Sequence, residues 1–94
     1  MIVWTDQAVR QLEQAWDHIG LSNSEDVADR IIARILISVQ RLDTFPMSGR
    51  TGRVSGTREL VIARLPFIAA YTVDGDRVVI LAVYHSSRQW PEAF

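Results

Sequence analysis

The chain lacks cysteine and lysine, and no stretch of its 94 residues is apolar for long enough to span a membrane. The absence of cysteine excludes disulfides, thiolate nucleophiles and zinc–thiolate sites together. All ten basic residues are arginine, and we attribute this bias to genomic base composition rather than to function. The N-terminus has no charged segment ahead of an apolar one, so the sequence predicts a cytoplasmic protein without membrane contact.

A length of 94 residues predicts one domain, residues 1–94, with a modest core. Apolar residues make up 48% and charged residues 22%, as in globular proteins. The net charge of −1 argues against a protein that binds phosphate backbones, so we expect direct nucleic-acid binding to be weak or absent. The charge is uneven, because residues 1–45 hold seven acids against four arginines, whereas residues 46–94 hold six arginines against four acids. Any anionic contact is therefore expected in the second half.

The stretch from Arg58 to Pro91 contains the sheet around which the chain is organised. Asp74-Gly75 separates two β-branched runs, Phe67–Val73 and Arg77–Tyr84, and predicts a hairpin with a type I′ turn. Both faces of these runs are largely apolar. The predicted sheet is therefore covered on both sides near its centre.

The N-terminal part is predicted to form a strand followed by a helix. Ile2-Val3-Trp4 is a short apolar run that we assign to the edge of the sheet. Thr5 is expected to cap the helix, and Gly20 is expected to end it. His18 falls on the polar side of the helix and is expected to be a solvated surface residue. Residues with three- and four-residue spacing define the apolar face: Ala8, Leu12, Ala15, Trp16 and Ile19.

A second helix is predicted from the capping-box spacing of Ser22 and Glu25, starting near Asn23. It extends to about Asp43, and Pro46 prevents its continuation. Its apolar set is wider than one stripe and includes Ala28, Ile31, Ile32, Ile35, Leu36, Ile37, Val39 and Leu42. Since Ile37 lies outside the stripe, the helix either faces a partner or lies between two layers of its own domain.

Residues 45–57, FPMSGRTGRVSGT, form a glycine-rich loop with two arginines. The loop is not a Walker-type phosphate loop, because no Gly-Lys-Ser/Thr follows. We favour the interpretation that this loop is a solvated connection. The alternative is a mobile basic loop that binds an acidic partner. Glu59–Ala63 and the Leu65-Pro66 break complete the order β-α-α-β-β-β. This order predicts an α+β fold, with a helix hairpin packed on a small, mostly antiparallel sheet.

Several positions in the second half share a pattern with a known family. They are Gly56, Arg58, Glu59, Val61, Phe67, Tyr71 and the terminal run His85-Ser86-Ser87-Arg88-Gln89-Trp90-Pro91. With these positions the chain resembles the ParE/RelE superfamily of bacterial toxins from type II toxin–antitoxin modules. The helix hairpin and the Phe45-Pro46 exit fit the resemblance, which therefore covers nearly the whole chain and implies a RelE/ParE-like fold.

One branch of the superfamily, the RelE-like branch, consists of ribosome-dependent mRNA endonucleases. This reaction needs a base, an acid and cations on the phosphoryl oxygens. The resemblance offers His85 and Glu59 for the first two roles, and Arg64, Arg77 or Arg88 for the third. Ribosome-binding members are strongly basic, however, whereas this chain has a sequence pI near 6.0. In the other branch His85 is expected to be structural.

The ParE-like branch, which we favour, inhibits DNA gyrase and blocks replication by binding, without catalytic residues or a cofactor. The resemblance then implies target contacts through Arg88, Trp90, Arg58 and Arg77. It also implies a ParD-like antitoxin, and we predict that this antitoxin contacts the second helix through Ile37, Ile32 and Leu36 and pairs with one sheet edge. A toxin-derived binding module that has lost toxicity remains a third alternative.

Overall fold

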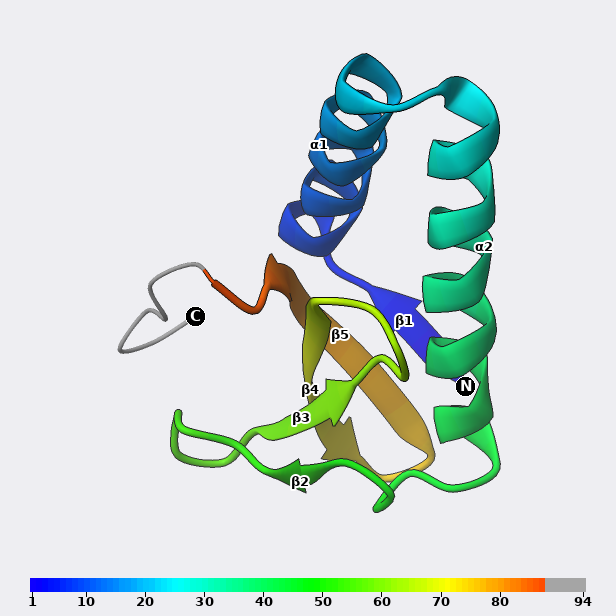
Figure 1. Ribbon diagram of the computed structural model, residues 1–94. Coiled ribbons are helices and arrows are strands. Elements are labelled where there is room, and N and C mark those ends of the chain that lie inside the picture. The colour runs from blue at the N-terminus through cyan, green and yellow to red at the C-terminus, as the bar shows by residue number, and fades with distance from the viewer. Residues whose placement is uncertain (88–94) are drawn as a thin grey trace.

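The computed structural model describes residues 1–87, in which two helices lie beside a five-stranded sheet (Figure 1). The elements follow in the order β1 (Ile2–Trp4), α1 (Asp6–Ser22), α2 (Glu25–Gln40), the 3₁₀ turn η1 (Arg41–Asp43), β2 (Arg50–Thr51), β3 (Arg58–Val61), β4 (Phe67–Asp74) and β5 (Arg77–His85). The predicted α+β architecture is confirmed. Strand β2 was not predicted.

The strands are arranged in the order β1-β5-β4-β3-β2. Strand β1 lies at one edge of the sheet, as predicted. It runs parallel to β5, and all other neighbours are antiparallel. The hairpin between β4 and β5 is also confirmed, but its central residues are Gly75 and Asp76 rather than Asp74 and Gly75. Of these two residues only Gly75 has a positive φ, of 60°, which is the pattern of a type II′ turn and not of the predicted type I′ turn.

The junction between the helices differs from the prediction at two residues. Thr5 caps α1 as expected, since its hydroxyl accepts the Ala8 N–H at 3.2 Å. Gly20, however, does not end α1, which continues to Ser22 and closes with Asn23. The Ser22 hydroxyl donates to the His18 carbonyl at 2.8 Å and is therefore committed to the end of α1. The N-cap of α2 moves to Ser24, whose hydroxyl accepts the Val27 N–H.

Both helices pack on one face of the sheet (Figure 1). The core on this face joins α1 and α2 to the sheet through buried residues that include Ala8, Ile35, Val39, Ala69, Tyr71 and Ile80. The opposite face is also buried at its centre, at Ile68, Ala70 and Ala82. The prediction that the centre of the sheet is covered on both sides is confirmed.

Candidate functional site

Two strand side chains hold the loop that precedes β3 on the helix-covered face. The Tyr71 hydroxyl, on β4, accepts the Gly49 N–H at 2.9 Å and donates to the Pro46 carbonyl at 2.8 Å. Arg58, on β3, donates from Nη1 to the Gly49 carbonyl at 2.8 Å. The approach is so close that a Cβ atom at Gly49 would come within 2.5 Å of the Tyr71 hydroxyl. This part of the loop is therefore fixed to the sheet.

A buried carboxylate holds the same loop from the other face of the sheet. Glu59 is only 1% exposed, and its Oε1 accepts from Arg50 Nε at 3.1 Å and from Arg50 Nη2 at 2.9 Å. Its Oε2 accepts the Arg53 N–H at 2.8 Å, and Arg53 Nε lies 3.7 Å away. The buried charge is thus compensated, and Arg50 and Arg53 are brought together on the face of the sheet opposite the helices. We refer to residues 49–53 as the arginine loop.

Burial raises the pKa of the Tyr71 phenol above its ordinary value. The hydrogen bond from Gly49 and the positive charge of Arg58 act in the opposite direction, because both stabilise the phenolate. Desolvation outweighs them. Tyr71 is therefore a neutral hydroxyl that donates one hydrogen bond and accepts another.

Replacing Tyr71 by phenylalanine is expected to lower the free energy of unfolding by about 1–3 kcal/mol at pH 7, because the Gly49 N–H and the Pro46 carbonyl lose their partner. The raised pKa adds a pH dependence. The neutral Tyr71 hydroxyl contributes its full stabilisation below about pH 10, the ordinary tyrosine pKa. This contribution is lost as the pH rises through the higher pKa of the folded state. Urea unfolding of both proteins at neutral and alkaline pH measures this difference.

The Tyr84→Phe variant, which alters a partly exposed tyrosine of β5, provides the control for that measurement. Tyr71→Phe is expected to show a smaller alkaline loss of stability than the unmodified chain, because it removes the phenol whose pKa is raised by burial. An equal alkaline loss in the Tyr71→Phe variant would contradict the assignment to Tyr71.

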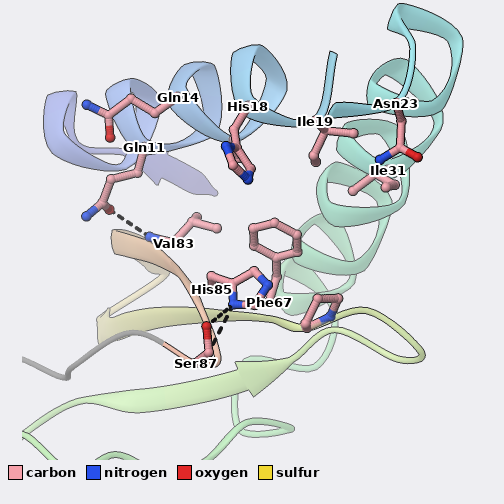
Figure 2. A pocket seen from close by; sticks show the side chains of 12 residues that line it. Gln11, Gln14, His18, Ile19, Asn23, Ile31, Phe67, Val83, His85 and Ser87 are labelled. Carbon is pink, nitrogen blue, oxygen red and sulfur yellow. Dashed lines mark hydrogen bonds between the residues drawn. The ribbon is translucent and has the colours of Figure 1, made fainter. Parts of the chain in front are cut away.

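His85, at the end of β5, forms one wall of a pocket of about 350 Å³ (Figure 2). Its Nδ1 accepts the Ser87 N–H at 3.2 Å and lies 2.7 Å from the Ser87 hydroxyl. Because Nδ1 accepts the Ser87 N–H, a neutral His85 ring carries its proton on Nε2. The ring also packs edge-to-face on Phe67, with centroids 5.4 Å apart. His18 is exposed, as predicted, and points into the same pocket from α1.

The base and acid considered for RNA cleavage are not assembled into one site. Glu59 pairs with Ala70 and His85 pairs with Phe67, so their side chains leave opposite faces of the sheet. Glu59 is already occupied by arginine donors, and His85 Nδ1 by Ser87. Arg64 is exposed in the β3–β4 turn and has a φ of 65°.

The residues considered for target binding are only partly described. Arg58 contacts loop carbonyls, and Arg77 forms an exposed ion pair with Asp74 at 3.4 Å. Arg77 begins β5 at the hairpin, and Arg58 pairs with Tyr71 near the middle of β4. Ser87 follows the other end of β5, whose span from Arg77 to His85 is about 26 Å by strand geometry. Arg88 and Trp90 lie outside the described residues.

The residues considered for antitoxin binding all lie on α2. Ile37 is 66% exposed and Leu36 is 43% exposed, whereas Ile32 is partly buried against the core. The outer face of α2 therefore presents apolar side chains to solvent. No helix in residues 1–87 has the length and apolar character that a membrane crossing requires.

Comparison with solved structures first defines the class of protein. The chain superposes on a chain of the chromosomal ParDE TA system from P. aeruginosa with a TM-score of 0.83 and 28% identity, covering 89% of this chain and 92% of that one. This is the fold of a toxin–antitoxin protein. The "Putative toxin Y4kP" of Sinorhizobium fredii is 43% identical over 91 residues, which cover 97% of this chain and 93% of that relative.

The particular family follows from residues 2–90, which match the model of the ParE toxin of the type II toxin–antitoxin system, parDE. The chain belongs to the ParE toxin family. The ParE-like interpretation of the sequence is thereby confirmed, and the comparisons support it rather than the RelE-like alternative. Membership in a two-component system implies an antitoxin as partner.

Proposed function

We propose that this toxin arrests growth by binding and inhibiting DNA gyrase, and that a ParD-like antitoxin holds it inactive. The observation that carries the proposal is membership in the ParE family over residues 2–90. The separation of Glu59 and His85 on opposite faces of the sheet supports action by binding rather than by RNA cleavage.

The target surface is assigned to the arginine-bearing half of the chain. The structure describes Arg58, Arg77 and the arginine loop on this half, and Arg88 and Trp90 follow Ser87 in the sequence. A few exposed guanidinium groups can steer association with an acidic protein surface without making the whole protein basic. Arg and Trp are also the side chains that most often dominate binding energy at interfaces.

Trp90→Ala and Arg88→Glu are expected to abolish growth arrest while the thermal midpoint stays near that of the unmodified chain. Losing one such anchor costs about 2 kcal/mol or more, which lowers affinity more than tenfold. The direct measurement is supercoiling by purified gyrase with added toxin. Undiminished supercoiling at toxin concentrations well above those that arrest cells would overturn the proposal that gyrase is the target.

The antitoxin is assigned to the outer face of α2 and to one sheet edge. Ile37, Leu36 and the partly buried Ile32 supply the apolar contact on α2. Strand β2 pairs with β3 only at Arg58 and Glu59, so within residues 1–87 the remainder of β3 has no strand on its outer side. An extended antitoxin segment that contains a helix fits both features, because the helix covers apolar side chains and the extended part adds main-chain hydrogen bonds.

A groove of about 400 Å³ lies close to both features, since Ser38 of α2 and Leu60 of β3 line it. It lies between the C-terminal part of α2 and β3 and is lined by Ser38, Arg41, Phe45, Ser48 and Leu60. A segment that crosses from α2 to the free edge of β3 passes over this groove. The antitoxin contact is therefore proposed to be continuous from the helix to the sheet.

A further inference from the structure

We propose that the outer edge of the Arg50 guanidinium is an anion-binding site that takes a carboxylate of the target protein, with Glu59 as its positioning residue. The proposal rests on the function proposed above, since it names the chemistry by which the toxin recognises its target. It starts from the geometry of Arg50 and Glu59 on the face of the sheet opposite the helices.

Arg50 offers only one of its edges to Glu59. Its Nε and Nη2 donate to the single oxygen Oε1, at 3.1 and 2.9 Å. A guanidinium carries five N–H groups in a planar fork, so both N–H groups of Nη1 and one of Nη2 are left over. Residues 1–87 supply no further partner for them. The Nη1–Nη2 edge is therefore available, and the side chain is 52% exposed.

The orientation of this edge is fixed before any ligand arrives. Glu59 is 1% exposed and is held on β3, and Arg50 is its strand partner on β2. The Arg53 N–H anchors the second carboxylate oxygen at 2.8 Å, so the Glu59 carboxylate is held at both oxygens. A preoriented arginine loses little rotamer freedom on binding, which increases its contribution to affinity and specificity.

The free edge selects an anion that presents two oxygens side by side. Two parallel N–H groups match the two oxygens of a carboxylate or a phosphate and give a bidentate, charge-assisted contact. Binding to a phosphate backbone gains affinity from many cations at once, whereas this chain has a net charge of −1 and Glu59 compensates one charge in the arginine loop. A single carboxylate on a protein surface therefore fits better than the phosphates of DNA.

The test is the Arg50→Lys variant, which keeps the positive charge and removes the planar fork. Its growth arrest in cells and its binding to purified gyrase without DNA are compared with those of the unmodified toxin. Arg30→Lys, at an exposed arginine on α2, is the matched control. Arg50→Lys is expected to bind gyrase about tenfold more weakly or worse and to lose growth arrest, whereas Arg30→Lys retains both. Antitoxin binding and the thermal midpoint confirm that both variants are folded.

The outcomes separate this proposal from the function on which it rests. Gyrase binding and growth arrest that are unchanged in Arg50→Lys overturn the anion site and leave gyrase as the target. Loss of growth arrest in Arg50→Lys, with no gyrase binding by the unmodified toxin, overturns gyrase as the target and supports the anion site. Binding that requires DNA and falls steeply with salt overturns the carboxylate assignment in favour of phosphate.

Discussion

Replacing Glu59 by alanine is expected to lower the free energy of unfolding by about 2–3 kcal/mol and to eliminate growth arrest. The substitution removes the acceptor of three donors at a site that is only 1% exposed. The Arg53 N–H loses its partner, Arg50 loses its orientation, and a cavity is left beside Ala70. Urea unfolding measures the loss of stability, and induction of the variant in cells measures growth arrest.

Two variants serve as controls for this prediction. Glu59→Gln keeps the volume and one acceptor oxygen and is expected to show a smaller loss of stability than Glu59→Ala. Glu13→Ala removes an exposed carboxylate of α1 and is expected to change the free energy of unfolding by less than about 0.5 kcal/mol. A Glu59→Ala variant as stable as Glu13→Ala would show that the contacts of Glu59 contribute nothing to the fold.

The elements with a clear local signal were predictable from sequence. Both helices were recognised from apolar residues at three- and four-residue spacing. Strand β1 was recognised from a short apolar run, and the β4–β5 hairpin from a turn dipeptide between two β-branched runs. The choice of β5 as the partner of β1 was not predicted from these three apolar residues. The parallel direction of β1 is a tertiary property that three residues do not encode.

The sequence-based assignment of elements was wrong where two residues could both cap a helix, and incomplete where a strand had no sequence signal. Ser22 and Ser24 are both good capping residues, and the choice depends on the Ser22 hydroxyl closing α1 at the His18 carbonyl. Strand β2 has only two exposed residues and no apolar alternation. It is held in place by Glu59, which binds the Arg50 side chain within β2, and by Tyr71, which binds Gly49 just before β2.

The candidate site depended on strand register, which the sequence leaves open. Glu59 and His85 are compatible with one catalytic site until the register places their side chains on opposite faces. The bond between Arg50 and Glu59 was missed for the same reason. Its only signal in the sequence was a pair of arginines in a glycine-rich loop ahead of a strand that carries a glutamate.

Replacing Ile37 by aspartate is expected to weaken the complex with the purified antitoxin at least about tenfold without unfolding the toxin. Ile37 is 66% exposed near the C-terminal end of α2, so its side chain contributes little to the core. A charge at the centre of an apolar contact must be desolvated without a partner when the antitoxin covers it. Calorimetric titration of each toxin variant with antitoxin measures the loss of affinity.

The neighbouring isoleucine on α2 separates binding from folding. Ile35 is fully buried, and Ile35→Ala is expected to lower the free energy of unfolding by about 2–5 kcal/mol, whereas Ile37→Asp changes it by less than about 1 kcal/mol. Ile37→Lys carries the opposite charge and is expected to weaken the antitoxin complex as Ile37→Asp does, because both remove the apolar contact. If only one sign of charge weakened the complex, α2 would contact the antitoxin through electrostatics and not through apolar burial. If neither variant weakened it, Ile37 would lie outside the antitoxin interface.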